Sequence, residues 1–192
     1  GDSTQLQASG GVIYSWSPAT GLSNPNIAAP IANPNSTTTY TVTVQAPSGQ
    51  QVHNPDFEQG NTGFTTDYTY DANTIQTPGL YTITDDASTV HPQFQGNDHT
   101  TGTGNFMAVN GQFTTNQDVW CQTVSVAPNT DYYISAWVLT LVNGDPALLE
   151  FTINGQSIGS PLITPPFGLN NWFEYGEVWN SGNNTTVGIC IK

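Results

Sequence analysis

The segment Asn54-Pro55-Asp56-Phe57-Glu58-Gln59-Gly60-Asn61-Thr62-Gly63-Phe64 has the pattern expected at the opening of a β-sandwich. Phe57 and Phe64 are its apolar anchors, and glycines punctuate the chain between them. Glu58 places a carboxylate beside a ring that we expect to be buried, so it needs a cation or hydrogen-bond donors. We predict one domain after this segment, over residues 52–192, and the end of another before it, over residues 1–45.

Composition favours strands and turns and excludes two classes of partner. The chain of 192 residues has a net charge of −13, and Lys192 is its single Lys or Arg. It is 36% hydrophobic, but eight Phe, eight Tyr and five Trp supply enough apolar area for a core. Nucleic acid and anionic membrane surfaces are excluded as partners because binding to either needs clustered basic side chains. No apolar run of membrane-spanning length is present, so membrane insertion is not expected.

The first 45 residues predict strands at 4–8, 12–18 and 37–44, with a long Pro- and Asn-rich connection over 21–35. Three strands do not enclose a core alone, so we expect a partial sandwich that is completed from elsewhere. The pattern begins and ends partway through a repeat, which predicts a piece of a longer protein. Residues 46–51 have no apolar periodicity and contain Pro47 and Gly49, as expected for a short linker.

Residues 52–192 predict an all-β domain built from strands at 81–84, 105–111, 119–126, 132–141, 148–153, 156–159, 172–179 and 185–191. The run 132–141 is the longest apolar one and predicts a central strand. Asn154-Gly155 suits a type I′ turn in a hairpin. Strands at this spacing, with no helical pattern, indicate a sandwich or a jelly roll.

Cys121 and Cys190 lie in two of these strands. Alternation places each on the less apolar face of its strand. Two interpretations remain open, a cross-strand disulfide and two unreactive thiols.

The first unit resembles the immunoglobulin-like or PKD-like repeats of Bacteroidetes surface proteins, including gliding-motility-associated adhesins. The matching residues are Gly1-Asp2-Ser3, Tyr14-Ser15-Trp16-Ser17-Pro18, Gly21-Leu22-Ser23 and Thr38-Thr39-Tyr40-Thr41-Val42-Thr43-Val44. The resemblance implies a β-sandwich spacer with Trp16 and Tyr40 in its core. Asp2-Ser3-Thr4 also resembles the short acceptor pattern of Bacteroidetes O-glycosylation, with Ser3 as the acceptor.

The second unit resembles the jelly-roll, carbohydrate-binding-module-like domains of large secreted Bacteroidetes proteins. The matching residues include Asn54-Pro55-Asp56-Phe57-Glu58, Asp98-His99-Thr100, Gly102-Thr103-Gly104-Asn105, Val119-Trp120, Phe151-Thr152-Ile153-Asn154-Gly155 and Trp179-Asn180-Ser181-Gly182. The resemblance implies a structural calcium held by Glu58, with Asp56 and Asp98 as helpers; the alternative is that Glu58 accepts backbone hydrogen bonds or is exposed. It also implies one further strand, which would follow Lys192.

Aromatic and polar side chains suggest where a ligand binds. Alternation in 172–179 places Phe173, Tyr175 and Trp179 on one face and makes Trp172 the best exposed platform for a sugar ring. Trp120 and Trp137 lie in apolar runs and are predicted to be core residues, and a core role also remains open for Trp172 and Tyr175.

The loop 90–100 carries Asp98 and His99 together with His91. Three interpretations remain open for it: a structural loop, a ligand-contact loop with Asp98 and His99 as contacts, and a zinc site.

No catalytic constellation is found: there is no phosphate-binding loop, no HExxH and no recognised nucleophile triad. We therefore expect a non-catalytic binding or adhesion module of a secreted or cell-surface protein, with a polysaccharide or cell-surface glycan as partner. One alternative is a structural repeat that assembles with neighbouring copies by strand exchange. Another is an accessory module of a secreted glycoside hydrolase.

Overall fold

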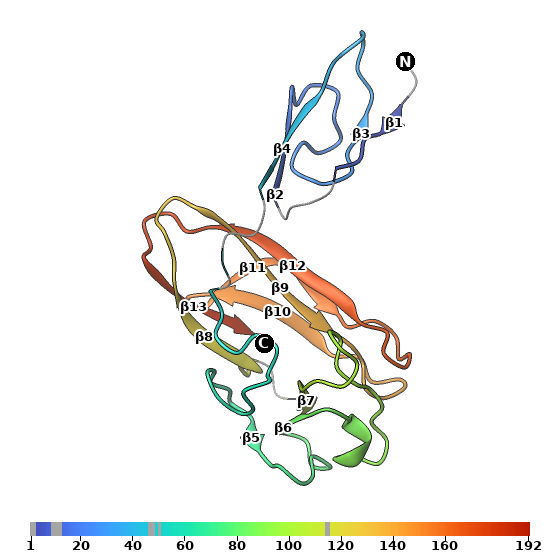
Figure 1. Cartoon of the computed structure of the whole chain (residues 1–192), viewed down its shortest axis with the longest axis vertical. Helices are drawn as coiled ribbons and strands as arrows, with labels where there is room; N and C mark the ends of the chain where they lie inside the picture. The colour runs from blue at the N-terminus through green and yellow to red at the C-terminus, as the bar shows by residue number, and fades with distance from the viewer. Residues whose placement is uncertain (1–2, 9–12, 46–48, 50, 114–115) are drawn as a thin grey trace. The chain divides into compact units, whose positions relative to one another are not determined.

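The computed structural model describes residues 3–8, 13–45, 49, 51–113 and 116–192. In these residues the chain is all-β, and the one helical turn described is the 3₁₀ helix η1 at Ala87–Thr89 (Figure 1). The predicted fold class is confirmed, whereas the immunoglobulin-like and jelly-roll arrangements stay predictions. The chain divides into two compact units, Gly1–Gln50 and Gln51–Lys192, and the division falls within the predicted linker. Among the described residues no helix has the length and apolar character needed to cross a membrane.

The first unit contains two antiparallel strand pairs. They are β1 (Thr4–Gln5) with β3 (Ile31–Ala32), and β2 (Ile13–Ser17) with β4 (Thr41–Gln45). Trp16 is buried, and its indole N–H donates to the Ile27 carbonyl oxygen at 2.9 Å, so its predicted core role is confirmed. Tyr40 precedes β4 and is half-buried, with its hydroxyl donating to the Thr20 carbonyl oxygen at 2.8 Å. The strand predicted from residue 37 therefore begins later, and β3 lies inside the predicted connection.

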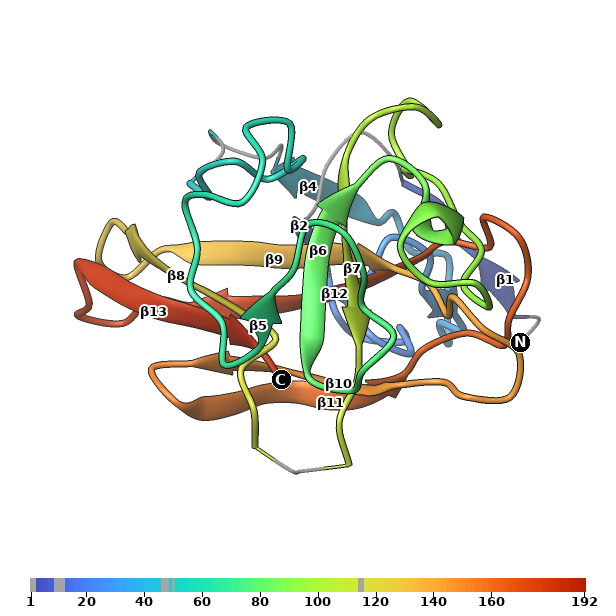
Figure 2. The same cartoon turned by 90° about the horizontal axis from the view of Figure 1, so that it is seen from below.

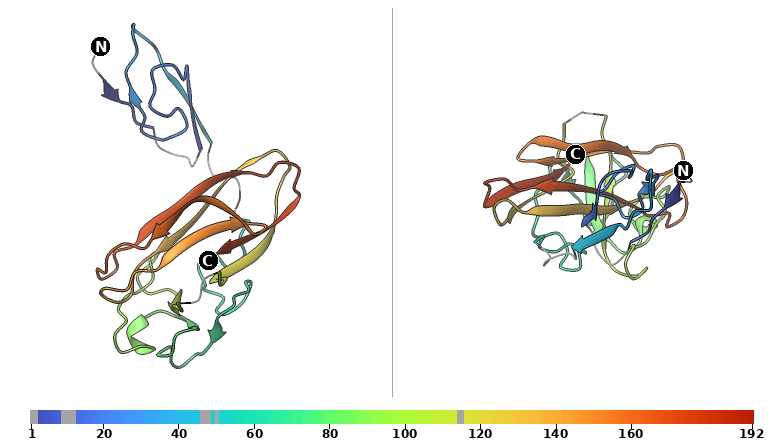
Figure 3. Two further views of the ribbon diagram at one scale, coloured as in Figure 1. Left: turned by 180° about the vertical axis from the view of Figure 1, so that it is seen from behind. Right: turned by 90° about the horizontal axis from the view of Figure 1, so that it is seen from above.

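The second unit contains two facing sheets. One has the order β11-β10-β13-β8, made of Gln156–Ile163, Leu148–Ile153, Thr186–Ile191 and Trp120–Ser125; the other pairs β9 (Asp131–Val138) with β12 (Phe173–Asn180) (Figure 3). An apolar cluster joins them, formed by Val124, Val126, Ile153, Val187 and Ile189 with Tyr132, Ile134 and Trp179 packed against it. Two sheets that bury one face each against a shared core are consistent with a β-sandwich.

A third sheet supports the loops at one end of this sandwich. It contains β5 (Thr69–Tyr70), β6 (Leu80–Thr84) and β7 (Phe106–Asn110), and Figure 2 shows β6 and β7 running across the direction of β9. Its core is formed by Ile75, Ala87, Val90, Phe94, Phe106 and Ala108, with Leu80, Leu141, Val142 and Trp172 packed against them. Since Leu141 follows β9 and Trp172 precedes β12, this cluster places loop 94–104 beside the ends of both strands.

The hairpin predicted at 148–159 is confirmed and is longer than expected. β10 pairs with β11 around Asn154 and Gly155, whose φ angles are 50° and 77°. A type I′ turn requires positive φ at both central positions, which Asn and Gly tolerate best.

The prediction that 132–141 forms a central strand is wrong. β9 ends at Val138, and its one hydrogen-bonded neighbour among the described strands is β12. Tyr132 and Ile134 point into the core, whereas Tyr133 and Ser135 alternate with them on the other face. The strand therefore has an open face.

The opening segment 54–64 forms a compact loop rather than a strand. Asn54 is 2% exposed, and its amide nitrogen donates to the Gly60 and Thr62 carbonyl oxygens at 2.9 and 2.8 Å. Phe57 and Phe64 meet edge to face with ring centroids 5.7 Å apart, as expected for apolar anchors. Asn54 therefore organises the loop through three hydrogen bonds, since its side-chain oxygen also accepts from the Gln59 N–H at 3.0 Å.

Candidate functional site

Three carboxylates predicted as metal ligands line one pocket of about 270 Å³. The lining residues are Asp56, Glu58, Asp98, Thr100, Thr101, Thr103 and Gly104, and we call this the carboxylate pocket. A Cβ atom at Gly104 would lie 3.1 Å from Asp98 Oδ2 and in collision with Glu58 Oε1. Both acidic side chains therefore point toward the same small volume, which only glycine leaves open.

Hydrogen bonds from the backbone hold two of these carboxylates in place. Glu58 Oε1 accepts from the Asn105 N–H at 2.6 Å, and Asp98 Oδ2 accepts from the Thr101 N–H at 2.6 Å and from its hydroxyl at 2.9 Å. Burial alone would raise the pKa of Asp98, but the hydrogen bonds donated by Thr101, Thr100 and Gly102 outweigh it and lower the pKa. Asp98 is therefore held as an anion facing the pocket.

The carboxylate pocket offers the oxygen ligands that calcium prefers, but its three carboxylates lie too far apart to coordinate one ion. Calcium takes six to eight oxygen ligands in proteins, with carboxylates prominent among them. Among the described residues, the one set of three candidate ligand atoms within 4.8 Å of one another is that of Asp118, Cys121 and Cys190. Asp56, Glu58 and Asp98 lie farther apart than that, so the calcium site stays a prediction.

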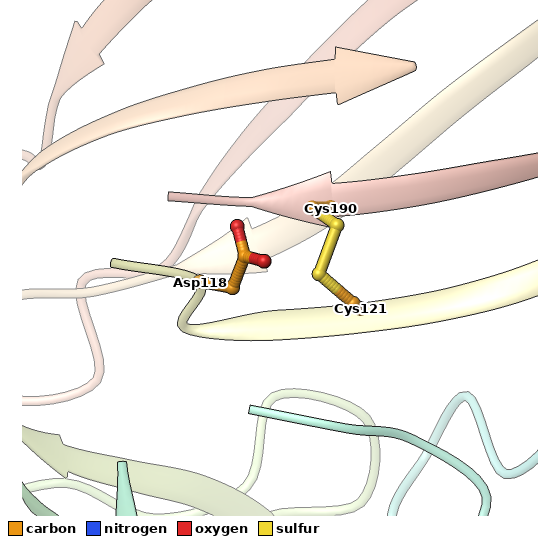
Figure 4. Close-up of side chains that lie close together, drawn as sticks. All are labelled: Asp118, Cys121 and Cys190. Atoms are coloured by element: carbon orange, nitrogen blue, oxygen red, sulfur yellow. A yellow bond between two sulfur atoms is a disulfide. The ribbon is translucent and has the colours of Figure 1, made fainter. Parts of the chain in front are cut away.

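The Asp118, Cys121 and Cys190 group is a disulfide with a neighbouring acid. Cys121 and Cys190 are directly paired across β8 and β13 and form a bond, which confirms the disulfide interpretation (Figure 4). Bonded sulfurs are not thiolates and do not hold a metal ion as such. Asp118 lies beside them, and its Oδ1 is 3.7 Å from the Lys192 ammonium nitrogen.

His99 links the carboxylate pocket to an aromatic surface. It follows Asp98 directly, and its imidazole stacks on the indole of Trp137 with ring centroids 3.8 Å apart and an interplanar angle of 15°. Although one side of it is covered in this way, Trp137 is 45% exposed. The prediction that Trp137 is a core residue is wrong, because alternation along β9 turns it away from the side chains of Tyr132 and Ile134 that pack in the core.

Trp172 is not the exposed platform that alternation predicted. It lies before the first residue of β12, where the chain turns at Asn170, so the alternation of the strand does not reach it. Its indole packs against the core cluster of the third sheet, meets Phe106 edge to face at 5.9 Å, and donates from Nε1 to the Asn97 carbonyl oxygen at 3.1 Å. Trp172 therefore supports loop 94–104 through its packing on the core cluster and its hydrogen bond to Asn97.

Tyr175 is also excluded as an exposed ligand contact. It is 5% exposed and stacks on Phe151 with ring centroids 4.3 Å apart. Its hydroxyl accepts from the Phe151 N–H and donates to the Ser160 carbonyl oxygen, at 3.2 and 3.1 Å. Alternation correctly placed Tyr175 and Trp179 on one face, but that face is the interior of the sandwich.

The remaining predicted residues are distributed as follows. His91 stacks on Phe94, with ring centroids 3.9 Å apart, and His99 stacks on Trp137, so the two imidazoles do not form a zinc site with Asp98. Ser3 is exposed, and the Asp2 that completes its acceptor pattern lies outside the described residues.

Sequence reasoning missed the open face of β9 and β12, which we call the outer face. Trp137 lies directly opposite Glu174, and Tyr133 lies opposite Val178, which is 51% exposed. Tyr133 lies flat over Gly176, where a Cβ atom would come 2.9 Å from Tyr133 Cε2, and its hydroxyl donates to Glu174 Oε1 at 3.2 Å. Ser135, a polar residue in step with Tyr133 and Trp137, was the available signal that this face is open.

Burial, followed by the charge of Glu174, raises the pKa of Tyr133 to about 12. The phenol therefore stays protonated at neutral pH and remains a donor to the carboxylate.

No protein-family model, curated protein or solved structure matches this chain.

Proposed function

We propose that this protein is a non-catalytic glycan-binding module of a secreted or cell-surface protein, and that it binds its ligand on the outer face. The single observation that supports the proposal is Trp137, which is 45% exposed on a strand beside Glu174 and stacks on His99, the residue after Asp98 of the carboxylate pocket. The position of this indole is fixed by its stack on His99, which leaves its other face free for a ligand.

The chemistry of this surface suits a sugar ring. A pyranose has an apolar face of C–H groups, which packs against an indole, and an equatorial rim of hydroxyls, which needs hydrogen-bond partners. Glu174 and the Tyr133 hydroxyl lie on the same face as Trp137 and provide acceptor oxygens for sugar hydroxyls, because the phenol proton is already donated to Glu174. Loop 94–104 contributes His99 to this surface and Asp98 to the carboxylate pocket. A longer glycan can therefore contact both the outer face and the pocket.

A disulfide in the second unit supports the assignment to an extracellular compartment. Disulfides persist in oxidising environments and are rare in reducing ones. Cys121 and Cys190 join β8 to β13 across the sheet that packs behind the outer face.

A glycan array followed by titration calorimetry tests this proposal. The Trp137→Ala variant should lose about 2 kcal/mol of binding free energy, or roughly 30-fold in Kd, as expected for a central aromatic contact. Phe113→Ala is the matched control, because Phe113 is fully exposed in a loop outside the site and its loss should leave Kd unchanged. The proposal fails if no glycan binds, or if Trp137→Ala binds as tightly as the wild type.

A second candidate function is a structural link between copies, and the first unit favours it. β4 is an edge strand of its two-stranded sheet, with Val42 and Val44 half-buried along it. An edge strand offers unpaired backbone groups to a neighbouring chain. Sedimentation velocity should then show concentration-dependent association that Thr43→Lys abolishes and Thr39→Lys, an exposed position before β4, does not. A monomer at all concentrations excludes this function.

A further inference from the structure

The outer face presents negative charge beside its exposed indole. Glu174 is the direct cross-strand partner of Trp137, so the two side chains project from the same face with Cβ atoms about 5 Å apart. Tyr133 donates to one oxygen of this carboxylate, Oε1. The second oxygen, Oε2, is available to a ligand that lies over the indole.

Acidic side chains also belong to the loop whose His99 stacks on Trp137. His99, stacked on the indole, is followed and preceded by residues that line the carboxylate pocket, in which Glu58 and Asp98 face the same volume. His99 therefore connects the indole of Trp137 to the loop that carries this pocket.

No Lys or Arg is placed beside these acids by the structure. Lys192 is the single Lys or Arg of the chain, and it lies 3.7 Å from Asp118 at the far ends of β8 and β13. The net charge of −13 adds a long-range field that attracts cations and repels anions. A positively charged ligand is therefore favoured at the outer face.

We infer that the ligand of the outer face is a glycan with free primary ammonium groups, that is, a de-N-acetylated amino-sugar polymer. This inference rests on the proposed function and narrows it to one class of glycan. The ammonium group of such a sugar gains a cation–π contact with Trp137 and a charge-assisted hydrogen bond to Glu174, while the C–H face of its ring stacks on the indole. A neutral sugar gains the stacking and its hydroxyl hydrogen bonds without the ammonium contacts, and a uronic or sulfated sugar is repelled by the surrounding carboxylates.

The test compares three glycans of equal length by calorimetry with the full chain: fully de-N-acetylated chitohexaose, its N-acetylated form, and hexagalacturonate. At about pH 6, below the pKa of about 7.7 of an α-amino group that the sugar amine resembles, we expect the de-N-acetylated glycan to bind at least tenfold more tightly than the N-acetylated one. Its affinity should fall as the salt concentration rises through about 0.1 to 1 M, and hexagalacturonate should not bind.

Two variants locate the effect. Glu174→Gln should weaken binding of the de-N-acetylated glycan about tenfold and weaken any binding of the N-acetylated glycan much less, because a side-chain amide oxygen still accepts from a sugar hydroxyl. Asp145→Asn, which removes one charge from an exposed loop outside the site, is the matched control and should change neither. Equal melting midpoints for the two variants and the wild type exclude a folding defect as the cause.

The outcomes separate this inference from the proposed function. Equal, salt-independent affinity for the two chitohexaoses overturns the ammonium requirement and leaves glycan binding in place. Absence of binding to every glycan overturns both. An oligolysine of equal charge that binds as tightly as the amino-sugar polymer also overturns the inference, because charge without a stacking ring would then be sufficient.

Discussion

Replacing Cys121 and Cys190 together with alanine should destabilise the second unit by a predictable amount. The two cysteines are 69 residues apart in sequence and directly opposite in the β8–β13 ladder. In the chain-entropy model, closing a loop of this length removes about 15 cal/mol/K from the unfolded chain, or about 4.4 kcal/mol at 25 °C. Measured effects usually fall below this value, so we expect a loss of about 3 kcal/mol and, for a domain of this size, a fall of about 10 °C in the melting midpoint.

Tryptophan fluorescence and far-ultraviolet circular dichroism measure this effect. Trp120 and Trp179 pack against the apolar cluster between the two sheets, so their emission reports unfolding of the second unit in the full chain. A reductant should lower the midpoint of the wild type to that of the double variant and leave the double variant unchanged. If the double variant melts within about 1 °C of the wild type, the disulfide does not constrain the unfolded chain as reasoned here.

Three further predictions follow from single sites. If Glu58 holds calcium, added calcium should raise the melting midpoint, a chelator should reverse the rise, and Glu58→Gln should abolish it; a wild type that ignores both reagents contradicts the calcium site. Asn54→Ala should cost about 3 kcal/mol in urea unfolding, because the 2% exposed amide makes three hydrogen bonds that the loop does not replace, and a cost below about 1 kcal/mol would refute this role. Tyr133, whose pKa is raised from 10.0 to about 12, should resist ionisation in an ultraviolet titration until about pH 12. The stability that its raised pKa contributes is complete below pH 10 and is lost between pH 10 and 12. Glu174→Gln should lower the pKa of Tyr133, because it removes a neighbouring negative charge.

Features that depend on local sequence could be predicted. The Asn154-Gly155 hairpin is specified by two residues that tolerate positive φ between two alternating runs, so no distant contact is needed to place it. Strand alternation left a Cys121–Cys190 disulfide as one of two interpretations, and the register that places the two cysteines opposite each other decides between them. Phe57 and Phe64 were identified as apolar anchors because both rings flank the same glycine-rich turn.

The roles of Trp137 and Trp172 could not be predicted, because each depends on which sheet face the fold covers. Trp172 and Trp137 both lie near the ends of apolar runs, yet the third sheet packs over Trp172 and leaves Trp137 open. Alternation assigns side chains to two faces of a strand but does not say which face meets another sheet. Tyr175 shows the same limit: its face was assigned correctly, and only the position of Phe151 on β10 shows that this face is buried.

The net charge of −13 does not show which acidic side chains have a basic partner, so the partner of each one has to be identified from the structure. The sequence shows a single basic residue, and the structure shows that Lys192 lies beside Asp118. Glu58 and Asp98 are instead held by backbone N–H groups, and Glu174 by a phenol, which are partial charges and leave each carboxylate its full negative charge. Hydrogen bonds of this kind fix where an anion points without neutralising it. A cation that arrived at one of these three carboxylates would not have to displace a basic side chain, so calcium or an ammonium-bearing ligand would gain more there than at Asp118.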